Sequence, residues 1–351
     1  MNTQTKKRKG EHVSICVKKD VAYAYNWLDD IEFVHKALTA FDYDDVDTHA
    51  SFIKHKLKLP FMITGMTGGY PEAKAINRAL ATACEEHGIA FGLGSQRAMI
   101  ENPALKETYY VRDVAPSIPI VGNIGAAQLL NYNSTQINDM LKSVEADYLA
   151  VHLNTLQELV QPEGDRKFAG VKERIDALVH EIEFPVILKE TGAGIGWETA
   201  EVFNSVFSKV AGFDVAGRGG TSWSKVEEVR GGDAGPFAEW GNPTPVCIAE
   251  VSELGVFTIA SGGIRNGLDA AKAIALGADI AGAASPFIRA YYKKRLDAEL
   301  KQWEVYLKRA MMLTNSRNIE ELGRASIVIT GKTAEYMLAK GISIQEYANR
   351  R

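Results

Sequence analysis

The sequence predicts an α/β fold: a (β/α)₈ TIM barrel with an N-terminal extension, a lid insertion after strand six and a C-terminal helical tail. Three observations predict it. Eight short apolar runs recur along the chain, helix-like stretches occupy most of the gaps, and each run closes on a polar or small residue. Apolar strands alternating with amphipathic helices indicate parallel pairing with right-handed crossovers. An open doubly wound sheet is the alternative, but eight similar units favour closure.

The expected strands are apolar segments that end at a turn signal. They are Phe61–Thr64, Ala90–Leu93, Ile120–Ile124, Tyr148–His152, Val186–Lys189, Phe213–Ala216, Val256–Ala260 and Ile280–Ala283. In the gaps, apolar residues recur at helical spacing. The expected helices are Ala73–His87, Ile137–Glu145, Lys172–Ile182, Glu198–Lys209 and Leu268–Leu276.

Three segments fall outside the repeating pattern, although we expect residues 1–351 to form one domain. Residues 1–59 precede the first strand as an arm and extension of the barrel, which spans residues 60–290. Residues 224–245 are rich in Gly, Pro and charge, and a long insertion of this kind indicates a lid or binding loop. Residues 291–351 are expected to form a helical tail, and Phe287–Leu313 is the longest helical stretch.

Composition excludes several classes of protein. Apolar residues make up 46% of the 351 residues and the net charge is −4, which argues against general affinity for nucleic acid or anionic membranes. No apolar run approaches the roughly 20 residues that span a bilayer. The three cysteines, Cys16, Cys84 and Cys247, lack metal-like spacing and favour a reducing compartment. With no secretory signal at the N-terminus, we expect a cytoplasmic protein.

The run Ser261–Arg265 predicts a phosphate-binding loop. Its glycines allow close approach of an anion, the helix that follows presents free N–H groups, and Arg265 adds charged donors. A second small-residue turn, Gly282–Ser285, follows the next strand. In a parallel barrel the loops after strands seven and eight often form one phosphate site.

The other strand ends form a ring of polar residues and glycines that suits flavin mononucleotide (FMN). The residues expected at the flavin ring are Thr64, Ser95, Asn123 and Lys189, and those expected at the phosphate are Thr221, Gly263, Arg265 and Ala284. A lysine beside the flavin N1–C2 region stabilises the anionic reduced form. Each residue also has a structural interpretation, such as a salt bridge for Lys189. Their occurrence at successive strand ends supports the site.

A second polar group follows strand four. His152, Gln157 and Glu158 share one loop, and Glu158 is a candidate Mg²⁺ ligand, because Mg²⁺ is usually held by one or two carboxylates with substrate phosphates and water. The basic cluster of residues 6–12 predicts an anion clamp on an arm that folds over the barrel mouth, which Arg97 could complete. A core histidine and a solvated basic tail are the structural alternatives.

The lid begins with two further candidates. Trp223 could wall an apolar pocket and Glu227 could act as an acid, although Trp223 could equally belong to the core.

Motifs along most of the chain, roughly residues 7–290, resemble the type 2 isopentenyl-diphosphate isomerases, which use FMN. The motifs are Arg8-Lys9-Gly10-Glu11-His12, Met66-Thr67-Gly68-Gly69, Gly94-Ser95-Gln96-Arg97, Gly122-Asn123-Ile124-Gly125, His152-Leu153-Asn154 with Gln157-Glu158, Lys189-Glu190, Gly219-Gly220-Thr221-Ser222-Trp223, Trp240-Gly241-Asn242-Pro243-Thr244 and Ser261–Arg265. The arm, the Ser-Gln-Arg run and the Gly-Gly-Thr-Ser-Trp run are the most specific to this family.

The resemblance implies a 1,3-allylic proton shift between isopentenyl and dimethylallyl diphosphate, with FMN that must be reduced, by NADPH for example, and with Mg²⁺. It implies substrate binding by Arg8, Lys9, Ser95, Gln96, Arg97 and Gln157, and metal binding by Glu158. It implies FMN binding by Thr64, Gly65, Met66, Thr67, Ser95, Asn123, Lys189, Thr221, Gly263, Ile264, Arg265, Ala283 and Ala284. We interpret the reduced flavin as the main acid–base group, supported by His152, Gln157, Trp223 and Glu227.

Rival interpretations remain open. FMN-dependent 2-hydroxy acid oxidases or dehydrogenases share the phosphate loop, but they need a His-Gly-x-Arg run that this sequence lacks. A non-catalytic flavin- or diphosphate-binding regulator is the alternative from another class. The helical tail offers a surface for a homo-oligomer, for which we expect a tetramer or octamer.

Overall fold

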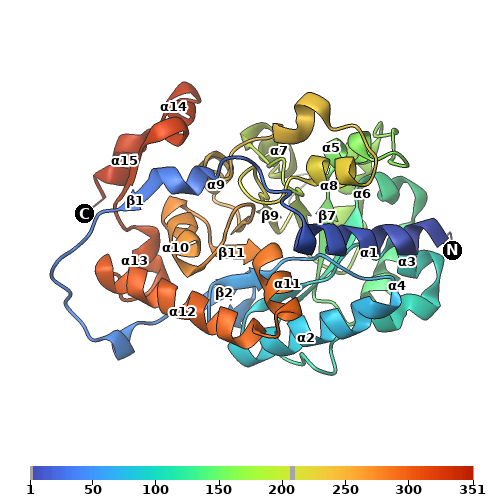
Figure 1. The fold of residues 1–351 in the computed structure, drawn as a ribbon, viewed down its shortest axis with the longest axis horizontal. Helices are drawn as coiled ribbons and strands as arrows, with labels where there is room; N and C mark the ends of the chain where they lie inside the picture. Colours follow the sequence, from blue (N-terminus) through green and yellow to red (C-terminus); the bar gives the residue numbers. More distant parts are fainter. Residues whose placement is uncertain (1–2, 206–209, 351) are drawn as a thin grey trace.

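A closed parallel barrel forms the centre of the molecule (Figure 1). The computed structural model describes residues 3–205 and 210–350, with side chains from Lys9 onward. In these residues the strands follow one another around the barrel in the order β10-β11-β4-β5-β6-β7-β8-β9. Their bounds are β4 Phe61–Ile63, β5 Ala90–Gly92, β6 Ile120–Gly125, β7 Tyr148–His152, β8 Val186–Lys189, β9 Gly212–Asp214, β10 Thr258–Ala260 and β11 Ile280–Ala283. The predicted fold class and all eight predicted strands are confirmed.

The strand register places the polar strand ends at one level of the barrel. Gly125 pairs with His152 across β6 and β7, and His152 pairs with Lys189 across β7 and β8. Lys189 pairs in turn with Asp214 on β9. Because all the strands are parallel, these side chains gather at the C-terminal mouth, where barrels of this kind carry their sites.

The predicted helices are present around the barrel. They are α2 Pro71–His87, α4 Ser134–Ser143, α6 Val171–Glu181, α7 Trp197–Phe203 and α10 Gly267–Leu276. Local signals set their ends: α2 starts with a proline in its first turn and stops at Gly88, whose φ is +62°, and Asn133 caps α4. Residues 206–209 of the expected helix Glu198–Lys209 lie outside the described residues.

The N-terminal extension contains elements that the sequence pattern did not predict. They are α1 Thr3–Lys18, the 3₁₀ turn η1 Trp27–Asp30, and the short strands β1 Ile31–Phe33, β2 Ala50–Phe52 and β3 His55–Leu57. The hairpin β2–β3 plugs the N-terminal end of the barrel, where Phe52 packs edge-on against Tyr148 and Phe257. The extension therefore reaches both ends of the barrel.

The predicted long helix Phe287–Leu313 is wrong as a single element. It consists of α11 Ser285–Tyr292 and α12 Leu296–Leu313, separated by Lys294 in the left-handed region at φ +55°. The break turns α12 back so that Trp303 packs against Phe61 and Phe287.

The rest of the tail is also not purely helical. Besides α13 Ile319–Gly323, α14 Gly331–Ala339 and α15 Ile344–Ala348, it contains β12 Ile327–Ile329, which pairs antiparallel with β1. The N-terminal extension and the C-terminal tail are therefore joined through β1 and β12, although the two ends of the chain lie on opposite sides of the molecule (Figure 1).

The insertion after β9 is partly helical. It contains α8 Trp223–Val229 and the 3₁₀ turn η5 Gly235–Glu239, and the barrel pattern resumes with α9 Thr244–Ser252. Other short helices follow strand ends: α3 Arg97–Glu101, η3 Pro103–Thr108, η4 Ala127–Asn131 and α5 Thr155–Val160. Helix α8 packs against α5 and α1, so the insertion and the N-terminal arm meet at the mouth.

The packing of α10 on α12 predicts a strong effect for one glycine. A Cβ at Gly267 would lie 1.9 Å from the carbonyl oxygen of Trp303. We expect Gly267→Ala to lower the free energy of unfolding by about 1–3 kcal/mol, as overpacked sites do. At Gly323 the nearest heavy atom to a new Cβ is 3.9 Å away, so Gly323→Ala serves as the control. Urea denaturation should separate the two variants, and equal midpoints would contradict this packing.

Candidate active site

The N-terminal helix brings a cation to the barrel mouth. Lys9 Nζ donates to the carbonyl oxygen of Ser95 at 2.6 Å and to the Tyr109 hydroxyl at 2.7 Å. Ser95 follows β5, so the contact ties α1 to a strand end. The arm therefore packs over the mouth as predicted for the basic cluster, and its next face residue, His12, lies one helical turn further on. The side chain of Arg8 lies outside the described residues.

Glu227 is the hub of the polar contacts between arm and lid. Its side chain is fully buried, and its Oε1 lies 2.8 Å from His12 Nε2 and 2.9 Å from Gln157 Nε2. Arg230 forms an ion pair with its other oxygen. Burial opposes ionisation, but the hydrogen bonds from His12 and Gln157 and the charges of His12 and Arg230 outweigh it and lower the pKa of Glu227. A buried carboxylate is therefore held ionised among α1, α5 and α8.

Trp223 stands next to this hub. Its ring meets the His12 ring edge-on, with 5.1 Å between centroids, and it packs against a small apolar cluster that includes Cys16 and Val226. Trp223 thus forms an apolar wall beside the polar network. Trp223 lies at the start of α8, and its role as the wall of a pocket stays a prediction.

His152 is held as a neutral hydrogen-bonding group. Asn123 Nδ2 donates to the carbonyl oxygen of Leu93, so Asn123 Oδ1 faces His152 Nδ1 at 2.8 Å and accepts a hydrogen bond from its N–H. Burial, followed by the positive charges of Lys189 and Lys9, lowers the pKa of His152 from 6.5 to about 3. His152 is therefore uncharged at neutral pH and supports the site by hydrogen bonding.

The low pKa of His152 predicts a pH dependence of stability. Between about pH 6.5 and pH 3 the unfolded chain binds a proton at His152 that the folded chain does not, so stability falls as the pH falls through this window. His152→Gln removes this proton uptake. We expect the difference in thermal midpoint between wild type and variant to shrink from pH 7.5 to pH 4.5. A difference that stays constant with pH would contradict the buried neutral state.

The residues expected at a flavin ring converge from several strands. Lys189 Nζ donates to the carbonyl oxygen of Glu190 at 2.5 Å and lies 3.5 Å from Asp214, which also accepts a hydrogen bond from Ser261. One pocket of the mouth is lined by Gly65, Asn123, Lys189 and Asp214 among others. Lys189 is only 9% exposed, so its charge acts in a largely dry environment.

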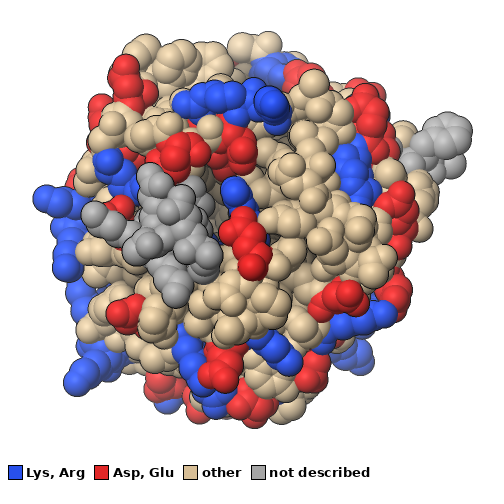
Figure 2. All heavy atoms as spheres, turned by 90° about the vertical axis from the view of Figure 1, so that its right-hand side faces the viewer, with Lys and Arg blue, Asp and Glu red and all other residues tan. Residues whose placement is uncertain are grey.

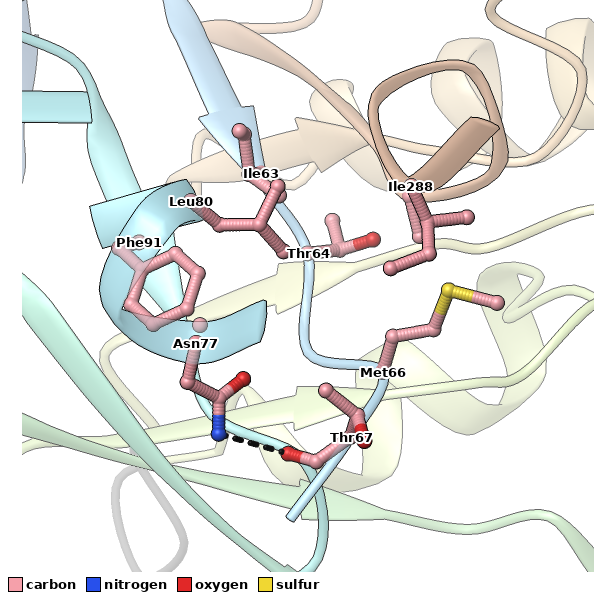
Figure 3. A pocket seen from close by; sticks show the side chains of 10 residues that line it. Ile63, Thr64, Met66, Thr67, Asn77, Leu80, Phe91 and Ile288 are labelled. Carbon is pink, nitrogen blue, oxygen red and sulfur yellow. Dashed lines mark hydrogen bonds between the residues drawn. The ribbon is translucent and has the colours of Figure 1, made fainter. Parts of the chain in front are cut away.

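The loop after β4 packs closely against the loop after β5. A Cβ at Gly65 would lie 2.0 Å from the carbonyl oxygen of Leu93, so only glycine allows this approach. Thr64, Met66 and Thr67 of the same loop line a second pocket, where Asn77 donates to the Thr67 carbonyl oxygen (Figure 3). Ala284 also lines this pocket, so the turn after β11 lies near Thr64, which we expected at the flavin ring.

The predicted phosphate loop has the backbone of an anion site. Gly262 and Gly263 have φ of +94° and +86°. Across the described residues, the amides of Gly263, Ile264 and Ala284 have no hydrogen-bond acceptor in the chain. The loop of Gly219–Thr221 packs closely against it, since a Cβ at Gly220 would lie 2.5 Å from the Gly263 nitrogen. These free amides and glycines fit a bound phosphate.

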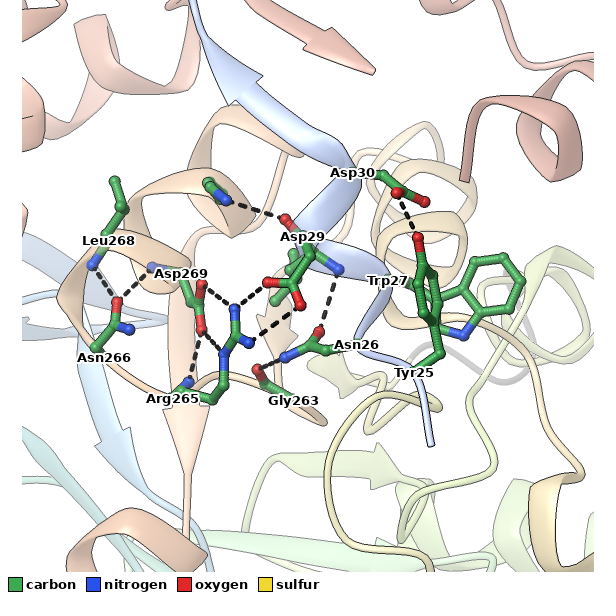
Figure 4. Close-up of polar contacts among 12 residues, drawn as sticks. Tyr25, Asn26, Trp27, Asp29, Asp30, Gly263, Arg265, Asn266, Leu268 and Asp269 are labelled. Atoms are coloured by element: carbon green, nitrogen blue, oxygen red, sulfur yellow. Dashed lines mark hydrogen bonds and ion pairs between the residues drawn. The ribbon is translucent and has the colours of Figure 1, made fainter. Parts of the chain in front are cut away.

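Arg265 is engaged differently from the sequence expectation. Its Nε donates to Asp269 at 2.7 Å and its guanidinium also pairs with Asp29 of η1 (Figure 4). The hydrogen bond to Asp269, followed by that to Asp29, raises the pKa of Arg265. Two carboxylates thus pair with the cation that we expected to serve the phosphate.

Glu158, the candidate metal ligand, is connected to Arg97 through polar contacts with Asp165. Glu158 is 9% exposed and accepts hydrogen bonds from Asn154 Nδ2 at 3.2 Å and from the amide of Asp165 at 2.8 Å. Arg97 pairs with Glu101 at 2.8 Å and lies 3.9 Å from Asp165. Among the described residues no group of three or more His, Cys, Asp or Glu side chains could hold a metal. Mg²⁺ at Glu158 would therefore need oxygens from substrate and water, as is usual for this ion.

Comparison with known proteins identifies the family. Residues 245–329 match the family described as FMN-dependent dehydrogenase. The isopentenyl-diphosphate delta-isomerase of Methanothrix thermoacetophila is 44% identical to the chain. The alignment covers 99% of the chain and 100% of the relative. The enzyme of that name from Pyrococcus furiosus is 42% identical, covering 99% of the chain and 93% of the relative. The chain belongs to the FMN-dependent, type 2 isopentenyl-diphosphate delta-isomerase family.

Solved structures agree with the barrel fold. A mandelate oxidase variant with an FMN adduct superposes with a TM-score of 0.61 at 14% identity, covering 91% of the chain and 92% of that protein. Mandelate oxidase with benzaldehyde gives the same TM-score at 16% identity. At this identity the likeness shows the fold alone, so the type 2 isomerase family is established by the sequence relatives.

Arg230 and Asp214 were not predicted for the site, and His12 was predicted only as part of the basic cluster of residues 6–12. His12 and Arg230 join the Glu227 hub, and Asp214 lies beneath Lys189. The spacing of three residues places His12 on the same helix face as Lys9, but it gives no signal for the contact with the distant Glu227. Gln96 is fully buried; its Oε1 accepts the amide of Asn123, so it supports a strand end.

A larger cavity of about 800 Å³ also opens on this face of the isomerase-family barrel. Arg218 and Glu190 line it from strand ends, and Phe237 and Trp240 from the lid. Helix α5 and Tyr336 of α14 also line it. Because these segments are far apart in the sequence, sequence spacing did not predict the cavity.

On the face shown in Figure 2, Lys and Arg are interspersed with Asp and Glu, with no basic stripe. In the part of the chain that is described, no helix has the length and apolar character needed to cross a bilayer.

Proposed function

We propose that the protein interconverts isopentenyl diphosphate and dimethylallyl diphosphate by a 1,3-allylic proton shift with reduced FMN and Mg²⁺, as part of isoprenoid biosynthesis. The observation that carries the proposal is the buried, ionised Glu227 with Gln157 and His12, next to Trp223 and one helical turn from Lys9. A small alkene with an anionic head needs such a combination of apolar wall, buried charge and basic clamp. The names of the close relatives support the same reaction.

FMN would be held by the residues that converge at the mouth. Lys189 and Asn123 would meet the ring, and the amides of Gly263, Ile264 and Ala284 would meet the phosphate. Thr64 to Thr67, Ser95 and Thr221 lie on loops at the mouth, and Ala283 ends β11. When bound, reduced FMN supplies electron density that stabilises a cationic alkene and a site for proton exchange.

The substrate diphosphate would bind between arm and barrel. Lys9 lies at Ser95, and Arg97 reaches the loop of Asp165 and Glu158. We propose that Arg8, Ser95 and Gln157 join this clamp and that Glu158 binds Mg²⁺. The metal and cations would balance a multiply charged head group that the chain, with its net charge of −4, does not otherwise attract.

The chain's own groups would protect and orient the reacting alkene. Glu227 holds Gln157 Nε2 and His12 Nε2 in place and adds negative charge near developing positive charge. Trp223 excludes water from one side. Neutral His152 keeps Asn123 aligned beside Lys189 without adding a competing cation.

Three further properties belong to the proposal. NADPH would reduce the flavin, the protein would act in the cytoplasm, and it would assemble as a homo-oligomer, a tetramer or octamer. Light scattering of the FMN-loaded protein tests the assembly directly.

An anaerobic activity assay tests the proposed function. FMN-loaded protein is reduced with NADPH or dithionite, supplied with Mg²⁺ and isopentenyl diphosphate, and followed by ¹H NMR. We expect dimethylallyl diphosphate only with reduced flavin, and no flavin reduction by lactate or mandelate. Reduction by a 2-hydroxy acid would favour the oxidase alternative, and FMN and diphosphate binding without turnover would favour a regulator.

A further inference from the structure

The N-terminal extension reaches the phosphate loop through Asn26. Asn26 Nδ2 donates to the carbonyl oxygen of Gly263 at 2.8 Å, across 237 residues of sequence (Figure 4). Its Oδ1 accepts the amide of Leu28 and so caps η1. The same oxygen lies 3.0 Å from the position a Cβ would take on Gly263 and 3.4 Å from that on Gly219. Asn26 therefore lies against both glycine loops assigned to the phosphate.

Peptide geometry connects this contact to the anion site. In a trans peptide the C=O of one residue and the N–H of the next point in opposite directions within one plane. The chain contains no cis peptide in its described part, so fixing the Gly263 oxygen also fixes the direction of the Ile264 N–H. That N–H is one of the amides without an acceptor among the described residues. Gly263 has φ +86°, a region that glycine adopts freely, so the hydrogen bond from Asn26 restricts a peptide plane that glycine itself leaves mobile.

The segment that carries Asn26 is itself held from both sides. Toward the barrel, Asp29 pairs with Arg265 and the Leu28 carbonyl oxygen accepts Lys272 Nζ at 3.0 Å. Toward the C-terminal tail, the Trp27 carbonyl oxygen accepts Thr333 Oγ1 at 2.8 Å. The segment Trp27–Asp30 of the N-terminal extension is thus fixed between α10 of the barrel and α14 of the C-terminal tail.

We propose that Asn26 is a positioning residue for the FMN phosphate: it orients the Gly263–Ile264 peptide so that the Ile264 amide is available to the anion. The inference rests on the proposed use of FMN. On this proposal, the Asp29–Arg265 ion pair holds the segment that carries Asn26 in place. The N-terminal extension, with the C-terminal tail packed behind it, then contributes to cofactor binding.

Riboflavin and FMN separate this role from general structural support, because riboflavin has the same ring and no phosphate. Asn26→Ser keeps a side-chain oxygen that can cap η1 but is too short to reach Gly263. We expect it to weaken FMN binding about tenfold, the order of one lost hydrogen bond in an organised site, and to leave riboflavin binding unchanged within about twofold. Asn26→Asp keeps the cap, places a carboxylate against a carbonyl, and should weaken FMN binding further.

The measurement is titration of apoprotein with each flavin, followed by quenching of flavin fluorescence. Asn318→Ser, at the cap of α13, is the matched control and should change neither affinity. Equal loss of both affinities, or no loss of FMN affinity in either Asn26 variant, would overturn the proposal. If the wild-type protein bound FMN but showed no isomerase activity, the proposed function would be rejected. The test of Asn26 would still hold, because it measures only flavin binding.

Discussion

Glu227→Gln is expected to lower kcat for isomerisation by about 10²–10³-fold while FMN binding is retained. The substitution keeps the shape and the contacts to Gln157 and His12 but removes a buried negative charge, and preorganised charge in a dry site contributes on this order. Steady-state kinetics under anaerobic conditions measure the effect. We expect the change in kcat, with little change in KM.

Glu228→Gln is the control for this prediction. Glu228 is the next residue on α8 but is exposed, so its substitution should leave kcat unchanged. If both variants retained wild-type kcat, Glu227 would have no part in the reaction and the hub would be purely structural.

Lys189→Gln is expected to lower kcat by a similar factor of about 10² or more and to shift the flavin midpoint potential to more negative values. Lys189 is the largely buried cation at the end of β8, and its removal withdraws the charge that favours the anionic reduced form. Spectrophotometric redox titration measures the potential independently of turnover.

Lys142→Gln provides the comparison for Lys189. Lys142 is an exposed residue of α4 outside the mouth, where it forms an ion pair with Glu183. Its substitution should therefore change neither kcat nor the flavin midpoint potential. An unchanged potential in Lys189→Gln would place this cation away from the flavin.

Sequence patterns predicted the barrel because each barrel strand carries its own local signal. The run Ile120–Gly125, for example, is apolar, ends in glycine, and forms β6 with neighbours on both sides. The break in the predicted helix Phe287–Leu313 was missed, because it depends on Trp303 packing against the distant Phe61. Helix α1 was missed for the same reason, since its apolar face packs against residues of α8 and α11.

The candidate site was predictable where a residue follows a strand directly, as Asn123 and Lys189 do. It was not predictable where the partner is remote. His12 and Glu227 are 215 residues apart, and Arg265 and Asp29 are 236 apart. The pairing of Arg265 with two carboxylates therefore could not be read from the Ser261–Arg265 run. Long-range charge pairing decides which cations of a motif remain available to a ligand.

The most direct test of the account follows solvent hydrogen and flavin redox state in one sample. FMN-loaded protein, reduced anaerobically in D₂O with Mg²⁺ and isopentenyl diphosphate, is observed by ²H NMR and by visible absorbance. The account predicts dimethylallyl diphosphate carrying deuterium from solvent, with the absorbance of reduced flavin unchanged over many turnovers. Product without solvent deuterium, or flavin oxidation in proportion to product, would contradict a proton shift without net electron transfer.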